Sequence, residues 1–162
     1  MESVSDQNIK IIQAETSDQI SDAKVLFREY ETWLNLDLCF QGFEAELAAL
    51  PGKYAKPEGR LLLAYFDDSL AGCIALRKLD EGISEMKRLF VREQFRGERI
   101  GISLIEKLIL DAREIGYSKL RLDTYPPKMG KAVSMYESHG FRVIPPYYDN
   151  PHDDVLFMEL SL

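Results

Sequence analysis

The spacing of hydrophobic residues changes several times along the chain, and each change predicts an element of secondary structure. Residues 9–14 are rich in β-branched side chains, which predicts a short strand. The residues after it combine the spacing of a helix capping box with a helical repeat of apolar positions that runs to Leu34. A second helix is expected over residues 43–50, because a Pro-Gly pair follows it.

The middle of the chain predicts three strands and a long helix. The strands are expected over residues 60–66, 70–76 and 83–91, with a turn at 67–69 between the first two. The repeat then becomes helical over residues 102–115, and the glycine that follows is expected to end this helix. The remaining residues predict a strand, a short helix and two further strands, over 119–123, 132–139, 141–144 and 155–160.

Length and composition limit this order of elements to one domain. The chain has 162 residues, of which 46% are hydrophobic and 29% are charged, and this is ordinary for a soluble domain with a single core. We see no internal repeat, low-complexity tract or linker. We therefore expect residues 1–162 to form one domain of the α/β (α+β) class around a mixed sheet.

The net charge of the chain indicates which classes of partner it is expected to avoid. Asp and Glu number 27 against 20 Lys and Arg, and the resulting net charge of -7 repels phosphate backbones and anionic membranes. No apolar run approaches the roughly 20 residues that span a bilayer, and the first residues lack the basic and apolar regions of a signal peptide. We expect a cytoplasmic protein that binds neither nucleic acid nor membrane.

The cysteines indicate no metal site. Cys39 and Cys73 stand alone, with no CxxC motif and no clustered histidines. Neither a zinc site nor a disulfide framework is therefore predicted. We expect both to be reduced cysteines in the core.

A loop with two glycines lies between strand 83–91 and the long helix. Residues 92–101 read REQFRGERIG. A strand, such a loop and a helix start bring free backbone N–H groups and the positive end of a helix dipole to one point, a geometry that binds phosphate. Arg96 and Arg99 add cationic donors, although the loop matches neither the P-loop nor the dinucleotide-binding fingerprint. A solvated loop with glycines for turn geometry is the alternative.

Four segments of the chain carry a family resemblance. They are SEMKRLFV at 84–91, FRGERIG at 95–101, LDT at 122–124 and AVSMYESHGF at 132–141. In this order and spacing they resemble the GNAT N-acetyltransferase superfamily, over residues 60–144 above all. The resemblance implies a single GNAT-like domain in which about four helices flank a central, mixed, mostly antiparallel sheet of about seven strands.

The resemblance also implies acetyl-CoA as the donor and direct transfer of its acetyl group to an amine within a ternary complex. The family resemblance further implies a bulge beside the central strand of the sheet. In the family's pattern a glycine stands where this chain has Arg99, and an asparagine that binds the pantetheine arm stands where it has Met129. The residues that this resemblance expects to bind acetyl-CoA are Leu89, Phe90, Val91, Arg96, Gly97, Glu98, Arg99, Ile100, Gly101 and Ile102.

Two residues are candidates for the proton transfers that amide formation needs. By resemblance, Tyr136 takes the place of the general acid that serves the departing thiolate, and simple packing in an amphipathic helix is its alternative. Glu85 stands where some members of the family hold a base, while others use a chain of water molecules. A salt bridge from Glu85 to Arg77, Lys87 or Arg88 is the alternative.

The acceptor is expected to be the primary amine of a small molecule or peptide, bound by Arg77, Gln41 and Tyr148. Arg77 and Arg88 also suit an acceptor carboxylate, which favours an amino acid. Two other functions stay open. One is a catalytically weak CoA-binding regulatory module, which the two departures from the family pattern favour, and the other is acetylation of a protein N-terminus or lysine. A homodimer is an open alternative to a monomer.

Overall fold

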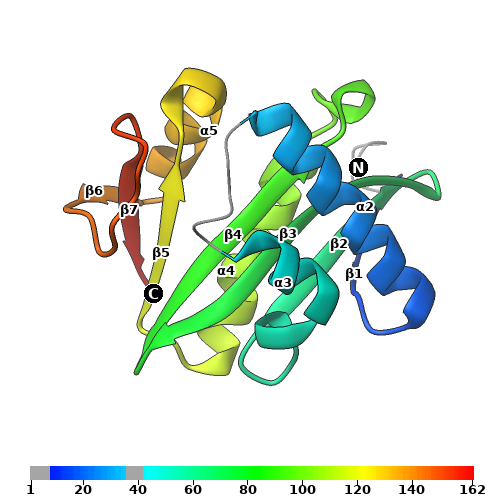
Figure 1. Ribbon diagram of the computed structural model, residues 1–162, viewed down its shortest axis with the longest axis horizontal. Coiled ribbons are helices and arrows are strands. Elements are labelled where there is room, and N and C mark those ends of the chain that lie inside the picture. Colours follow the sequence, from blue (N-terminus) through cyan, green and yellow to red (C-terminus); the bar gives the residue numbers. More distant parts are fainter. Residues whose placement is uncertain (1–7, 36–41) are drawn as a thin grey trace, which may run out of the picture.

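The computed structural model describes residues 8–35 and 42–162 of the chain. Its seven strands are β1 (Ile9–Gln13), β2 (Arg60–Phe66), β3 (Ser69–Asp80), β4 (Ile83–Val91), β5 (Lys119–Thr124), β6 (Arg142–Ile144) and β7 (Leu156–Ser161). They form one sheet in the order β1-β2-β3-β4-β5-β7-β6 (Figure 1). All neighbouring pairs are antiparallel except β4 and β5, which are parallel.

Four α-helices accompany this sheet within the described residues. They are α2 (Ser17–Leu34), α3 (Phe43–Ala49), α4 (Ile100–Ile115) and α5 (Pro126–Ser138). The order of helices and strands, and the mixed, mostly antiparallel sheet, confirm the predicted fold class.

The predicted bounds are wrong for β3, which continues four residues beyond the predicted end at Leu76, and above all for helix α5. Helix α5 begins at Pro126 and not at Ala132, because Pro126 and Pro127 occupy its first positions, where a missing N–H breaks no helical hydrogen bond. Met129 has non-helical torsions (φ -122°, ψ 30°), so the helix is kinked there. Prolines are typical of loops, and this tendency obscured the first turns of the helix in the sequence.

The predicted helix ends are confirmed where a cap was expected. The Thr16 hydroxyl accepts a hydrogen bond from the Gln19 N–H at 3.2 Å, and the Gln19 side-chain oxygen accepts one from the Thr16 N–H at 3.0 Å. These two bonds form the capping box that starts α2. Gly116 ends α4 with a left-handed backbone (φ 109°).

The sheet separates two hydrophobic cores. Helix α4 lies behind the sheet in Figure 1, whereas α2 and α3 lie in front of it. Leu104, Ile105 and Leu108 of α4 are buried in the core on one face. Phe27 of α2 and Phe43 of α3 are buried in the core on the other. The apolar stripe of each helix therefore packs against a different face of the same sheet.

Strands β4 and β5 are paired at one end only. Their parallel register joins Ile83–Glu85 to Lys119–Arg121, and beyond it the strands diverge (Figure 1). Arg88 has a left-handed backbone (φ 61°) within β4, where the register with β3 shifts between Cys73 and Ala75. This irregularity agrees with the bulge that the family resemblance implies. The divergence opens the sheet at the place where the candidate site lies.

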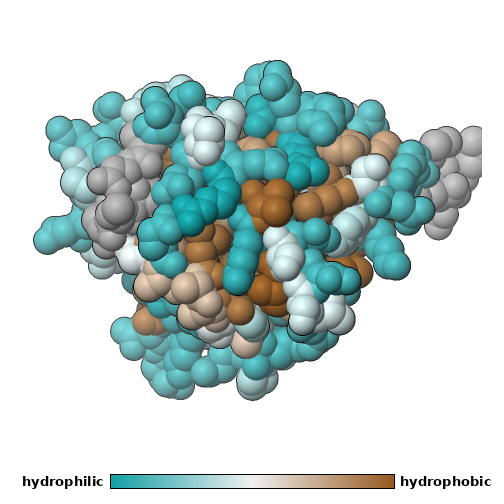
Figure 2. All heavy atoms as spheres, turned by 45° about the vertical axis from the view of Figure 1, so that its right-hand side comes forward, coloured by the Kyte–Doolittle hydropathy of each residue, from teal (hydrophilic) through white to brown (hydrophobic). Residues whose placement is uncertain are grey.

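The surface in Figure 2 is mostly hydrophilic, with one area of hydrophobic residues near its centre. Large hydrophobic side chains are mostly buried, and the exposed ones in the described residues are Val25, Leu110 and Val143. None of the helices in residues 8–35 and 42–162 combines the length and apolar character that crossing a membrane requires.

Close packing of β3 against β4 makes a glycine necessary at position 72. A Cβ atom there would lie 2.7 Å from the Phe90 carbonyl oxygen, whereas a Cβ at Gly130 in α5 meets nothing within 4 Å. We expect Gly72→Ala to lower the free energy of unfolding by about 1–3 kcal/mol. The control Gly130→Ala should leave it unchanged or raise it by up to about 1 kcal/mol, because alanine favours helix. Urea denaturation measures both, and equal midpoints would contradict this account.

Candidate active site

A groove runs between the N-terminal end of α4 and helix α5, along the second half of β4. It consists of two adjoining hollows of about 450 Å³ each. Glu98 lies outside its lining, and the backbone N–H of Glu98 donates to the Phe95 carbonyl at 3.3 Å. The other residues that we expected to bind acetyl-CoA line this α4–α5 groove, namely Leu89, Phe90, Val91, Arg96, Gly97, Arg99, Ile100, Gly101 and Ile102.

The start of α4 gives the groove an end that suits an anion. The N–H groups of the first turn of α4 have no acceptor within the helix, and its dipole is positive there. Among the described residues, no side chain caps these groups. A Cβ at Gly101 would meet Val91 Cγ2 at an ordinary 3.8 Å. The packing of the protein therefore does not itself require glycine at position 101. A glycine at this place leaves room for a ligand against the backbone, so the residues fit a phosphate-bearing ligand.

Cationic side chains surround this end of the groove. Arg99 precedes α4 with a left-handed backbone (φ 64°), a conformation that favours the glycine expected from the family pattern, and Arg99 also lines the groove. Arg96 donates from Nε to the Val91 carbonyl at 3.0 Å, and its guanidinium lies 5.1 Å from the ring centroid of Trp33. Lys131 lines the groove as well. The net charge of the chain is negative, but this part of the surface is positive.

Tyr136 lies where the groove meets a second hollow. This hollow, the β4–β5 cavity, opens between the diverging strands and has a volume of about 40 Å³. Leu89, Met129 and Tyr136 line both. Tyr136 is 3% exposed, and burial raises the pKa of its phenol well above the ordinary value, as do the neighbouring Tyr30 and Asp123. Tyr136 therefore keeps its proton at neutral pH.

Asp123 brings a carboxylate to the β4–β5 cavity. It lies on β5, and the Tyr148 hydroxyl donates a hydrogen bond to its Oδ2. The Asn150 amide in turn donates to the Tyr148 hydroxyl at 2.9 Å. Burial raises the pKa of Asp123 above its usual range, although the positive charge of Lys87 opposes the shift. Tyr148, which we expected to bind the acceptor, is thus beside the cavity and in contact with an acid.

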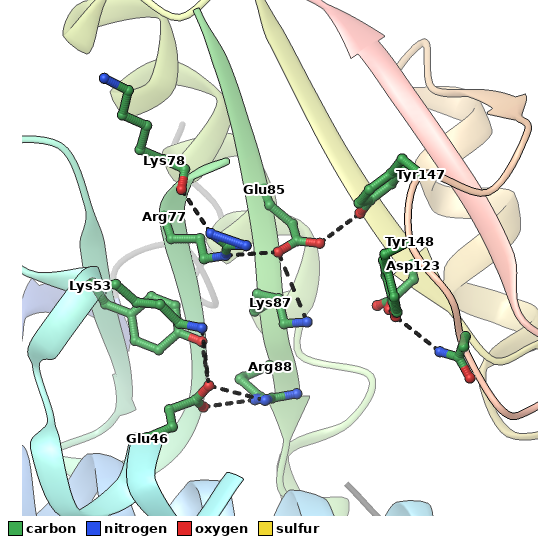
Figure 3. Close-up of polar contacts among 12 residues, drawn as sticks. Glu46, Lys53, Arg77, Lys78, Glu85, Lys87, Arg88, Asp123, Tyr147 and Tyr148 are labelled. Atoms are coloured by element: carbon green, nitrogen blue, oxygen red, sulfur yellow. Dashed lines mark hydrogen bonds and ion pairs between the residues drawn. The ribbon is translucent and has the colours of Figure 1, made fainter. Parts of the chain in front are cut away.

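Glu85 forms an ion pair with Arg77. From the sequence, such a salt bridge was the alternative to a catalytic base. Glu85 Oε1 lies 3.0 Å from Arg77 Nε, and Glu85 Oε2 accepts a hydrogen bond from the Tyr147 hydroxyl at 2.7 Å (Figure 3). Arg77 also donates to the Lys78 carbonyl at 2.9 Å. Neither Glu85 nor Arg77 is among the residues that line the β4–β5 cavity. Glu85, the candidate base, and Arg77, the candidate acceptor-binding cation, therefore neutralise each other beside the β4–β5 cavity.

A second ion pair joins α3 to β4. Arg88 contacts Glu46 through Nε (3.0 Å) and Nη2 (3.1 Å), and Tyr54 donates to Glu46 at 2.9 Å (Figure 3). Burial alone would raise the pKa of Glu46, but the hydrogen bonds and charge of Arg88 outweigh it and hold this pKa below its ordinary value. Gln41, the remaining residue expected at the acceptor side, lies outside the described residues, as does Cys39. Cys73 is buried, as predicted.

Sequence reasoning gave no catalytic or binding role to Lys87 and Asp123, two charged residues that line the β4–β5 cavity. Asp123 lies in one of the quoted family segments, yet neither its spacing nor its neighbours indicate a role. Lys87 was considered only as a partner of Glu85. The available signal was a polar residue within a buried strand, which is unusual. This signal does not show which residues of another strand lie beside it.

Comparisons with known proteins agree with this fold. The model of the acetyltransferase (GNAT) family matches residues 24–141. An N-acetyltransferase of Schizosaccharomyces pombe is 37% identical and covers 96% of each chain, and one of Dictyostelium discoideum is 35% identical over 95% of this chain and 99% of its own. The crystal structure of an acetyltransferase from Streptococcus agalactiae superposes with a TM-score of 0.79, at 23% identity, over 96% of this chain and 99% of that one.

These matches identify the class of protein that the fold and the site define. The chain belongs to the GNAT family of N-acetyltransferases and is therefore an acyltransferase.

The buried ion pair between Glu46 and Arg88 predicts a specific loss of stability. Glu46→Gln should lower the free energy of unfolding at pH 7 by about 3–5 kcal/mol, because it removes the carboxylate charge that pairs with the buried Arg88 guanidinium. The control is Glu44→Gln on the same helix, whose partner Arg28 is exposed and whose loss should leave the midpoint of unfolding almost unchanged.

The same pair predicts how that loss depends on pH. The pKa of Glu46 is lowered in the folded protein, so its contribution is complete above the unfolded pKa of about 4.3 and disappears as pH falls through the lower folded value. The difference between the parent and Glu46→Gln should therefore shrink below about pH 4. A difference that stays constant from pH 7 to pH 3 would rule out this pair as its cause.

Proposed function

We propose that the protein transfers the acetyl group of acetyl-CoA to the primary amine of a small molecule. The observation that carries this proposal is the position of Tyr136, a buried phenol that lines both the α4–α5 groove and the β4–β5 cavity. A donor bound in the groove and an acceptor bound in the cavity would meet at this residue.

The α4–α5 groove supports acetyl-CoA as the donor. The N–H groups at the start of α4, with Arg96 and Arg99, would hold the phosphates, and Leu89 to Val91 would lie along the pantetheine arm. Two structures with this fold, both under 25% identical to the chain, contain the ligand or its product. They are a PaiA N-acetyltransferase of Thermoplasma acidophilum with coenzyme A and a GNAT acetyltransferase of Elizabethkingia anophelis with acetyl-CoA (TM-scores 0.72 and 0.67).

The β4–β5 cavity supports a small acceptor. Its volume of about 40 Å³ admits the amine end of an acceptor, and its lining places charged side chains around that end. One relative, the N-acetylaspartate synthetase of Danio rerio, is named for an acetylated small molecule, and 60% of this chain matches 35% of that protein at 32% identity. The buried polar groups that meet at the cavity favour turnover over a regulatory module that only binds CoA.

The side chains at this junction account for both proton transfers. When bound, acetyl-CoA supplies a thioester carbonyl carbon, at which the bond to the amine nitrogen forms and the bond to sulfur breaks. Asp123 would take the proton that the acceptor ammonium loses, because burial raises the pKa of Asp123 and makes it a better base than an exposed aspartate. Tyr136 would give its proton to the departing sulfur. This assignment moves the base from Glu85 to Asp123, which lines the cavity.

Acetyl-CoA binding is tested by placing a negative charge in the groove. Saturating acetyl-CoA should stabilise the parent by about 2.7 kcal/mol at a hundredfold excess over Kd, which a thermal shift measures. Gly101→Asp should abolish the shift, because its carboxylate would face the phosphates while the packing around position 101 tolerates a side chain. Ser69→Asp adds the same charge at the exposed first residue of β3 and should keep the full shift. The absence of any shift in the parent would refute the donor site.

The role of Tyr136 is tested by removing its hydroxyl. Tyr136→Phe should lower kcat by about a hundredfold and leave the Kd for acetyl-CoA nearly unchanged, because the hydroxyl acts only on the leaving group. Tyr117→Phe is the matched control, since Tyr117 donates to the Glu58 carbonyl at 2.6 Å and lines neither the groove nor the cavity. Activity of Tyr136→Phe within twofold of the parent would exclude the acid role.

A further inference from the structure

Lys87 brings a cation to the β4–β5 cavity that the surrounding protein does not neutralise well. Its side chain is only 7% exposed, and its Nζ lies 3.9 Å from Glu85 Oε1, beyond hydrogen-bond distance. That oxygen already accepts a hydrogen bond from Arg77 at 3.0 Å. In residues 8–35 and 42–162 the Lys87 ammonium makes no hydrogen bond. A nearly buried ammonium with three unused donors is costly, so a bound anion would stabilise it.

The other cations nearby are already engaged. Arg77 is paired with Glu85, and Arg88 forms two hydrogen bonds with Glu46. Lys53 is 45% exposed, lies 3.8 Å from Glu46 and does not line the cavity. Figure 3 shows Lys87 between the two ion pairs, with its ammonium directed toward the side of β5. Of these four cations, Lys87 is the one left to bind a negative charge on a ligand.

Asp123 supplies the opposite charge in the same cavity. Both residues contact Tyr148, whose hydroxyl donates to Asp123 and whose ring centroid lies 6.0 Å from the Lys87 Nζ. One small cavity thus presents a cation from β4 and an anion from β5, on either side of the divergence between the strands. A single ligand that pairs with both residues carries a positive and a negative group.

We propose that the acceptor is an amino acid, with its carboxylate on Lys87 and its ammonium on Asp123. This inference rests on the proposed function and names the class of its acceptor. The reaction balances as an ordinary amide synthesis. The ammonium gives one proton to Asp123, and its nitrogen bonds to the acetyl carbon as the bond from that carbon to sulfur breaks. The sulfur leaves with the proton of Tyr136, and the second proton of the nitrogen converts the Tyr136 phenolate back to a phenol. The carboxylate takes no part in bond making and only positions the amine, so Lys87 is a residue that determines specificity.

The test compares acceptors that differ only in the carboxylate. The twenty common L-α-amino acids are assayed with acetyl-CoA, each beside its own α-carboxamide, and a third set contains simple primary amines. We expect at least one amino acid to exceed its carboxamide in kcat/KM by about 30-fold or more, because the carboxamide leaves the buried ammonium without a countercharge. The amine of a carboxamide loses its proton more easily, so its slower reaction would not arise from amine chemistry.

Two variants assign the effect to one side chain. Lys87→Met removes the ammonium and keeps the length of the side chain. It should raise KM for the preferred amino acid at least about tenfold, change kcat by less than about threefold, and bring the amino acid and its carboxamide to similar kcat/KM. Lys53→Met removes a neighbouring charge outside the cavity and should change neither parameter by more than twofold. A fall in kcat with unchanged KM in Lys87→Met would contradict the assignment.

The outcomes separate this inference from the function on which it rests. Carboxamides or simple amines that react as well as amino acids would overturn the amino acid acceptor and leave the acetyltransferase function intact. A thermal shift with acetyl-CoA but no turnover of any amine in the three sets would overturn both. The comparison of amino acid with carboxamide is made on the parent protein, so it decides the question even if Lys87→Met does not fold.

Discussion

The candidate site depends on the separation of β4 and β5 after three residue pairs. A parallel pair that continued along the whole of β4 would fill the space between the strands with backbone hydrogen bonds and leave no cavity. The left-handed backbone at Arg88 and the register shift against β3 accompany this change in direction. Leu89, Met129 and Tyr136 line both the groove beside α4 and the cavity at this gap. Helix α5 follows β5 directly, and it places Tyr136 at this opening.

The buried charges around this gap differ in what they do. Glu46 with Arg88 and Glu85 with Arg77 are ion pairs that join neighbouring elements, and a broken buried pair is costly. Their carboxylates are therefore poor candidates for accepting a substrate proton. Asp123 and Lys87 have less complete partners and line the cavity. A carboxylate with a guanidinium within hydrogen-bond distance, such as Glu46 or Glu85, stabilises the fold. A carboxylate without one, such as Asp123, is available to a substrate.

The end of the groove that we propose to bind phosphate departs from the family pattern and keeps a left-handed backbone where that pattern has glycine. The position that the family pattern gives to glycine has a left-handed backbone, and Arg99 adopts it at a modest conformational cost. The loop therefore keeps its shape and gains a cation that lines the groove. Met129 stands where the pattern has an asparagine, and it coincides with the kink in α5. Hydrophobic contact replaces an amide along that part of the wall.

The sequence by itself determined the order of elements, the ends of α2 and α4 and the strand, loop and helix that form the groove. These features depend on residues close together in the chain, such as the capping pair Thr16 and Gln19 and the helical repeat that ends at Gly116. The start of α5 was the local exception, because Pro126 and Pro127 suit both a loop and a first helical turn.

Only the tertiary structure decided which charged residues meet. Glu85 and Lys87 alternate on β4, and their spacing alone does not show that Arg77 of β3 neutralises Glu85. Asp123 lies on a strand that reaches β4 only after the intervening helix α4, so no local pattern predicts that it shares a cavity with Lys87. Burial and ion pairing depend on contacts between distant segments, and for that reason the residues that we propose as base and as acceptor-binding cation became visible only in the folded chain.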